Sequence, residues 1–174
     1  MEIVVLRYGH RIIRDERVTS HCCLAARALG AKKIIIEGSE DKTLTEVIES
    51  MSKKWGSGFK VEFTDSWRKT LAEYKKKGYT SVHLTMYGGE AERFIGEIRK
   101  KEKILAIIGS QKVERDVYEK SDYNISITQQ PHSEISALAV FLYMLTSGKT
   151  GLKKAQLSIV PDVKGRKIVK NTKK

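Results

Sequence analysis

Short apolar runs alternate along the chain with longer polar or amphipathic stretches. The apolar runs are rich in Ile and Val and predict six buried β-strands. They are Ile3–Leu6, Lys33–Ile36, Lys60–Phe63, Ser81–Leu84, Ile104–Ile108 and Asn124–Ile127. The stretches between them predict helices, three of which stop near a glycine, as helices commonly do. They are Glu16–Leu29, Thr43–Lys54, Ser66–Lys77, Gly89–Lys101, Val113–Lys120 and Ser133–Thr146. This alternation indicates an α/β fold, with a mostly parallel sheet and helices on both faces.

The pattern changes after Gly148. Leu157–Val160 and Lys167–Lys170 flank a turn segment, Pro161–Gly165, which favours a β-hairpin over another strand–helix unit. The 174 residues suit one ordinary domain with little left for a second. We therefore expect a main α/β domain over residues 1–148 and a C-terminal hairpin or tail over residues 149–174.

Charge points to a polyanionic partner. The chain has 33 Lys and Arg against 21 Asp and Glu, a net charge of +12. Its last 26 residues hold eight lysines and Arg166 against the single acid Asp162, which places +8 of that charge in the tail. Nucleic acid is the natural partner of such a surface, because Lys and Arg neutralise phosphates. The alternative is a solvated basic tail without a partner.

The cysteines and histidines limit which disulfides and metal sites the chain could form. Cys22 and Cys23 are adjacent, which disfavours a disulfide within the chain and fits two core residues in a reducing compartment. The four histidines lack the spacing of metal ligands, so we expect no metal. No apolar run is long enough to span a bilayer, and the N-terminus lacks a secretory pattern. The expected location is the cytoplasm.

Three loops after predicted strands are candidates for ligand binding. They are Thr85–Gly89, Gly109–Val113 and Thr128–Glu134. Ligands of open α/β sheets bind beyond the carboxyl ends of the strands, and glycine lets backbone amides approach a ligand closely. The alternative is that these glycines only form turns. Motifs of common dinucleotide-binding folds, P-loop NTPases and α/β-hydrolases are absent from the sequence, which disfavours those classes.

Four arginines lie within eleven residues after the first predicted strand. Arg7, Arg11, Arg14 and Arg17 could bind phosphates, and Tyr8 could stack on a base. We therefore predict that this basic segment contacts RNA. The alternative is that Arg14 and Arg17 pair with nearby acids.

Several segments resemble one family in residue content and in order. They are Leu6–Arg11, Arg14–His21, His83–Gly88, Ile107–Val113, Asp122–Asn124, Gln130–Glu134 and Ala137–Leu142. Together they are similar to the archaeal tRNA (cytidine(56)-2′-O)-methyltransferases of the SPOUT superfamily, over nearly the whole chain to about Lys149.

The resemblance implies more than the patterns do. It implies a SPOUT fold with a deep trefoil knot in the C-terminal half, a homodimer, tRNA as partner and S-adenosylmethionine bound in the knot. Carried over by position, the implied cofactor contacts are Leu84, Gly109, Ser110, Gln111, Lys112, Val113, Ile127, Thr128, Gln129, Gln130, Pro131, His132, Ser133 and Glu134. Ser133 and Glu134 could also orient the substrate.

Related enzymes use an arginine near the start of the first long helix to help activate the ribose hydroxyl. We assign this role to Arg17, with Arg14 and Arg27 as rivals, because the usual Asn followed six residues later by Arg is missing before Gly30. A guanidinium is a poor base, since its pKa exceeds about 12, so we prefer a polarising role. The alternatives are a SPOUT enzyme for another RNA position or base, and a non-catalytic RNA-binding module.

Overall fold

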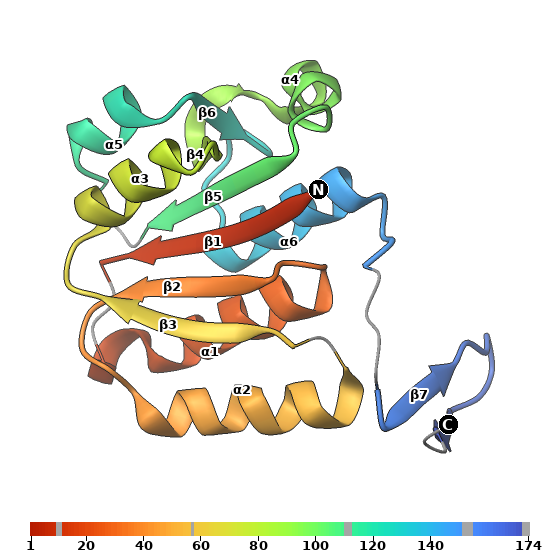
Figure 1. Cartoon of the computed structure of the whole chain (residues 1–174). Coiled ribbons are helices and arrows are strands. Elements are labelled where there is room, and N and C mark those ends of the chain that lie inside the picture. The colour runs from red at the N-terminus through yellow and green to blue at the C-terminus, as the bar shows by residue number, and fades with distance from the viewer. Residues whose placement is uncertain (10–11, 57, 110–112, 151–154, 172–174) are drawn as a thin grey trace.

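The computed structural model describes residues 1–9, 12–56, 58–109, 113–150 and 155–171, and the side chains of residues 12–14 and 16 are also outside the description. The strands are β1 (Glu2–Tyr8), β2 (Lys33–Glu37), β3 (Lys60–Thr64), β4 (Thr80–Glu90), β5 (Lys103–Gly109), β6 (Tyr123–Ser126), β7 (Leu157–Val160) and β8 (Lys167–Lys170). The helices are α1 (Ile12–Ala28), α2 (Lys42–Trp55), α3 (Trp67–Lys76), α4 (Ala91–Ile98), α5 (Arg115–Lys120) and α6 (Glu134–Thr146). Figure 1 shows their arrangement.

The six-stranded sheet has the order β3-β2-β1-β5-β4-β6. Every strand pair described in it is parallel, which confirms the predicted α/β class. β1 and β5 pair over their whole length, with Tyr8 opposite Gly109 at their carboxyl ends. The loops that leave these two strands therefore start side by side, at the sheet edge where ligands bind in such folds.

Both faces of the sheet are buried under helices, as predicted (Figure 1). Side chains of a strand alternate between faces. On β1, Ile3 and Val5 pack towards α1 and α6, whereas Val4 and Leu6 pack towards Trp67 of α3. This two-sided burial explains why the strands read as continuous apolar runs instead of alternating ones.

Two elements near the N-terminus extend further than the sequence indicated. β1 runs on to Tyr8, and α1 begins at Ile12 instead of Glu16. The charged stretch around Arg14–Arg17 lacks apolar periodicity, so the pattern assigned it to a loop. Packing of α1 against the sheet and α6 has a greater effect than this weak local signal.

The expected turn after Leu84 is also different. β4 continues to Glu90 and pairs again with β6 at Gly89–Ile125 after an irregular register. A Cβ on Gly88 would lie 2.5 Å from the backbone carbonyl of Asn124, so glycine permits a close approach of two strands here. As a result, α4 starts at Ala91 instead of Gly89. Independently of this, α5 starts at Arg115 instead of Val113.

β7 and β8 form the predicted antiparallel hairpin, separate from the main sheet. Figure 1 shows it beside the end of α2, and the backbone N–H of Gln156 donates to the carbonyl of Lys54 at 2.9 Å. Within the described part of the chain, none of the helices is long and apolar enough to cross a membrane.

Candidate active site

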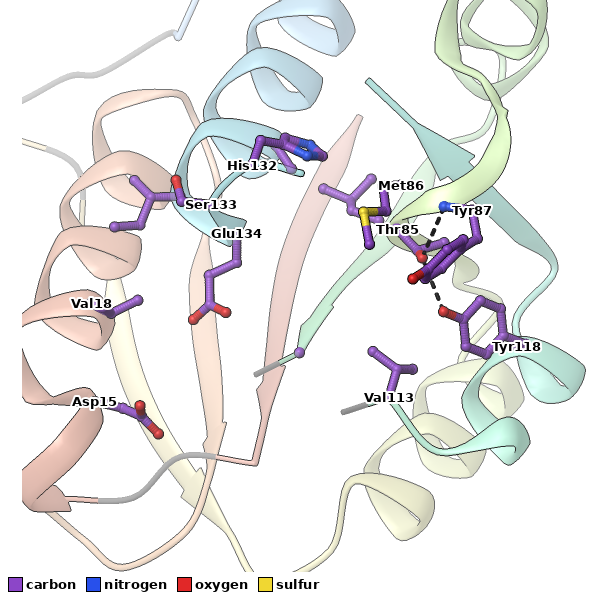
Figure 2. Close-up of a pocket in the computed structure, with 14 residues that line it drawn as sticks. Asp15, Val18, Thr85, Met86, Tyr87, Val113, Tyr118, His132, Ser133 and Glu134 are labelled. Carbon is purple, nitrogen blue, oxygen red and sulfur yellow. Dashed lines mark hydrogen bonds between the residues drawn. The ribbon is translucent and has the colours of Figure 1, made fainter. Parts of the chain in front are cut away.

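A cavity of about 640 Å³ opens at the carboxyl ends of β4 and β5, beside the start of α6 (Figure 2). A volume of several hundred Å³ suits a ligand the size of a nucleoside. The lining residues are Asp15, Val18, Leu84, Thr85, Met86, Tyr87, Gly109, Val113, Tyr118, His132, Ser133, Glu134, Ile135 and Ala137. The three candidate loops therefore converge on one cavity.

The structure brings together only part of the predicted cofactor set. Leu84, Gly109, Val113 and the run His132–Glu134 all line the cavity. Ser110, Gln111 and Lys112 lie outside the described residues. The described lining leaves out Ile127, Thr128, Gln129, Gln130 and Pro131, of which Ile127 packs against the core instead.

Gly109 shows why the second loop needs its glycine. A Cβ at this position would lie 2.3 Å from the ring of Tyr8 on the neighbouring strand. That ring cannot easily move, because it is buried and packs against Trp67 with ring centroids 5.9 Å apart. Glycine is therefore required at the end of β5 because a larger residue would clash with Tyr8, whether or not a ligand also needs close access there.

Arg7 does not have the predicted role in RNA binding. Its side chain is completely buried, and its Nη2 donates to Glu134 Oε1 at 2.6 Å. The prediction failed because β1 extends two residues beyond the predicted end at Leu6. Odd-numbered residues of β1 face α1 and α6, and Arg7 is one of them. Arg7 thus forms an ion pair with the first residue of α6, Glu134, which also lines the cavity.

Tyr8 is likewise not available for base stacking. It is buried on the opposite face of β1, in the cluster that contains Trp67 and Leu71. Burial raises the pKa of its phenol well above the ordinary value. The predicted RNA contact by Tyr8 is therefore wrong for this fold, and Tyr8 serves the packing of α3 against the sheet.

The other arginines differ in how far they are described. Arg11 and the side chain of Arg14 lie outside the described part of the structure. Arg17 is exposed on α1, next in sequence to Val18 of the cavity lining. Arg27 is buried near the far end of α1, where its Nη1 donates to the carbonyl of Gly56 at 2.8 Å. Ten residues of helix separate it from Arg17, about 15 Å, so Arg27 does not fit as the rival catalytic residue.

A part-buried network of polar side chains lies beside the cavity on the β4 side. The Nδ1–H of His83 donates to Asn124 Oδ1 at 2.8 Å, and the His83 ring meets the ring of Tyr118 edge-on with centroids 4.8 Å apart. The Tyr118 hydroxyl lies 3.1 Å from Thr85 Oγ1 (Figure 2). Burial lowers the pKa of His83, with Asn124 opposing it, so the imidazole stays neutral at neutral pH. These contacts connect His83 to Asn124 of β6 and Thr85 to Tyr118 of α5.

Sequence reasoning missed several lining residues. Thr85, Met86 and Tyr87 belong to a loop that was a candidate by position, but they were not among the predicted contacts. Asp15, Val18 and Tyr118 carried no local signal, because their helices reach the cavity only through tertiary packing. The hydrophobic Ile135 and Ala137 follow the predicted Glu134 on α6 and could have been inferred from helix geometry.

The lining combines apolar walls with two carboxylates. Leu84, Val113 and Ile135 supply apolar surface, whereas Asp15 and Glu134 enter from α1 and α6 (Figure 2). Such a cavity suits a ligand with both apolar and polar parts, and the charge of Glu134 is already balanced by Arg7. Within the described residues, no group of three or more His, Cys, Asp and Glu is placed to hold a metal ion.

The fold is that of the SpoU/TrmH RNA methyltransferases. A TrmH/SpoU tRNA modifying enzyme of A. aeolicus superposes with a TM-score of 0.65 at 19% identity, covering 85% of this chain and 75% of that one. The SpoU methyltransferase AviRb from Streptomyces viridochromogenes, solved in complex with AdoMet, gives 0.61 at 15% identity, covering 87% and 58%. At these identities the likeness shows the fold alone.

The sequence comparisons are more specific. The family model of the tRNA ribose 2′-O-methyltransferases, aTrm56, matches residues 55–169, and the chain belongs to this family. The tRNA (cytidine(56)-2′-O)-methyltransferase of Methanopyrus kandleri is 45% identical over 168 residues, covering 95% of this chain and 94% of that protein. The enzyme of the same name from Cenarchaeum symbiosum is 49% identical over 172 residues, covering 97% of each.

Proposed function

We propose that this protein transfers a methyl group from S-adenosylmethionine to the ribose 2′-hydroxyl of cytidine 56 in the TΨC loop of tRNA. Its family and the names of its full-length relatives support the reaction and the substrate. The observation that carries the proposal is the convergence of Leu84, Gly109 and His132–Glu134 on one cavity, in a chain of this family.

The described residues fit the cofactor. S-adenosylmethionine supplies an electrophilic methyl group on a positively charged sulfur. Asp15 and Glu134 offer carboxylate oxygens to its polar groups, and Leu84, Val113 and Ile135 provide surface for its apolar parts. The ion pair with the buried Arg7 orients the Glu134 side chain at the N-terminus of α6, so this carboxylate is positioned before a ligand binds. The run Ser110–Lys112 and the segment Ile127–Pro131 remain proposed contacts.

Arg17 is the proposed catalytic residue. It is exposed on the turn of α1 that also carries Val18 of the cavity wall. An exposed guanidinium there can bind the ribose or the adjacent phosphate and lower the cost of removing the hydroxyl proton. Most of the acceleration would come from alignment of the two reactants, which a preformed cavity provides. Arg11 and Arg14 remain proposed contacts to the RNA backbone.

Further proposals rest on the family. We propose a homodimer, a trefoil knot in the C-terminal half, and the cytoplasm as the place where tRNA is met. We also propose that residues 1–148 form the methyltransferase domain and that residues 149–174 act as a separate basic element. The convergence of three chain segments on the cavity supports the knot, and the exposed lysines of the hairpin support the basic element.

Radiolabelled methyl groups should pass from S-adenosylmethionine to transcript tRNA and should disappear when nucleotide 56 carries 2′-deoxyribose. Unchanged labelling of the deoxy substrate would exclude ribose methylation at this position. Mapping the modified nucleotide by mass spectrometry separates the proposal from a related enzyme that acts on a base or another RNA position. Calorimetry tests the third possibility, because a non-catalytic RNA-binding module should bind no cofactor even with tRNA present.

A further inference from the structure

Tyr87 is the most exposed aromatic residue at the cavity. Its side chain is 76% exposed, although it belongs to the cavity lining. Figure 2 shows it on the β4 side, across the cavity from Ser133 and Glu134 of α6. In the described part of the chain, the other largely exposed tyrosine is Tyr143, 59% exposed, which does not line the cavity. A large aromatic ring that borders a ligand site and faces solvent is accessible to a partner that approaches the cavity from outside.

The backbone next to Tyr87 has contacts on both sides. Its N–H donates to Thr85 Oγ1 at 3.4 Å, and Thr85 Oγ1 lies 3.1 Å from the hydroxyl of Tyr118. On the other side, Gly88 passes so close to Asn124 that no side chain fits between the two strands. These contacts restrict the backbone that carries the ring, and such restriction lowers the entropy lost when the ring binds a partner.

We propose that Tyr87 stacks on the base of the target cytidine while the ribose enters the cavity, an inference that rests on the proposed function. Aromatic side chains commonly bind nucleic acid by stacking on single bases, because each base has a π-face. When the cytidine leaves its stack so that its ribose enters the cavity, a ring beside the cavity compensates for the stacking that is lost.

Two other occupants fit the ring less well. Ligand sites of this size bury most of the ligand, so a ring that is 76% exposed faces what approaches from outside more than the cofactor's adenine. As an occupant of this ring, RNA carries the charge opposite to the chain's overall net charge of +12, whereas a second copy carries the same net charge; the proposed homodimer is a separate contact. Charge and exposure together favour a nucleobase of the RNA.

The variants Tyr87→Ala, Tyr87→Leu and Tyr87→Phe separate an aromatic face from mere bulk. With tRNA and saturating S-adenosylmethionine, Tyr87→Phe should keep the wild-type KM for tRNA within about twofold. Tyr87→Ala should raise it by about 5- to 100-fold, the range that stacking on one base supplies, and Tyr87→Leu should lie between. The matched control Tyr143→Ala removes an exposed tyrosine outside the cavity and should leave the KM unchanged.

A substrate change identifies the base. A tRNA with an abasic ribose at position 56 keeps the 2′-hydroxyl but has no base to stack. The wild type should lose on this tRNA about the factor that Tyr87→Ala loses on normal tRNA, and Tyr87→Ala should lose little more. If the loss from Tyr87→Ala and the loss from the abasic substrate multiply when the two are combined, the ring and the base act independently and the proposal is overturned.

Two more measurements keep this inference separate from the proposed function. Calorimetry without RNA should give the same S-adenosylmethionine affinity for wild type and Tyr87→Ala, and a weaker affinity in the variant overturns RNA stacking in favour of a cofactor contact. Fluorescence anisotropy should show weaker tRNA binding by Tyr87→Ala, which tests stacking even if the wild type transfers no methyl group. Wild-type activity with an unaffected Tyr87→Ala variant overturns the stacking alone.

Discussion

Replacing Arg7 by Met tests the ion pair below the cavity. The change keeps an unbranched side chain in the buried space but leaves the Glu134 carboxylate without its partner. Removing one partner of a fully buried pair costs about 3–5 kcal/mol, whereas exposed pairs contribute about 0–1 kcal/mol. The Arg7 side chain is 0% exposed and that of Glu134 is 18% exposed, so the pair belongs near the buried limit. We expect a loss of about 2–4 kcal/mol.

The assay is urea unfolding followed by tryptophan fluorescence, since Trp67 is buried in the core cluster on the other face of β1. A loss of this size corresponds to a fall in Tm of about 4–16 °C for a domain of this length. Arg27→Met is the matched control, because Arg27 is also buried but donates to the carbonyl of Gly56 instead of a carboxylate. It should cost less than Arg7→Met.

The double variant Arg7→Met/Glu134→Gln removes both charges. It should recover at least about 1 kcal/mol relative to the sum of the single changes, because no unpaired carboxylate is left. Additive single effects, or a smaller cost for Arg7→Met than for Arg27→Met, would show that the pair is not what stabilises this site.

Four further predictions follow from the site and the core. Ordinary overpacking costs about 1–3 kcal/mol, and Gly88→Ala should destabilise the protein by more than this, because the added Cβ meets backbone atoms that cannot move aside. An unchanged urea midpoint would contradict the close approach. Cys22 and Cys23 should react with a thiol reagent only after unfolding, because burial raises their pKa to about 12. Since the folded state keeps these protons, stability should fall as the pH rises from about 9 towards 12, and a flat profile above pH 9 would refute this. Arg17→Ala should reduce methyl transfer by about 10²- to 10⁴-fold with nearly unchanged cofactor affinity; full activity would transfer the role to another arginine. Truncation after Gly148 should weaken tRNA binding and flatten its salt dependence, and an unchanged salt slope would remove the tail from the RNA interface.

The periodicity of the strands was sufficient to predict the sheet. Runs such as Ile3–Leu6 and Ile104–Ile108 are apolar at every position, and only a strand covered on both faces buries all of them. Because parallel strands end at one edge, the segments after the predicted strands Ser81–Leu84, Ile104–Ile108 and Asn124–Ile127 could be chosen as a site from the sequence, although the first of them belongs to β4 in the structure. The cavity lined by Leu84, Gly109 and His132–Glu134 agrees with that choice.

The fate of individual polar residues could not be predicted in this way. Arg7 and Tyr8 look like an exposed basic and aromatic pair in the sequence, but one more pair of residues in β1 turns them to opposite buried faces. Local propensity is weak at the ends of strands and helices, so their bounds depend on what packs against them. The same holds for α1, whose early start brings Asp15 and Val18 to the cavity.

The sequence by itself thus determined the order of strands and helices, the class of fold and the edge of the sheet where a ligand binds, because hydrophobic periodicity is a local property of the chain. Only the tertiary structure decided which side chains reach the cavity. Burial of Arg7 against Glu134 and exposure of Tyr87 at the cavity depend on residues more than thirty positions away, whose contacts form only when the sheet and its helices have packed.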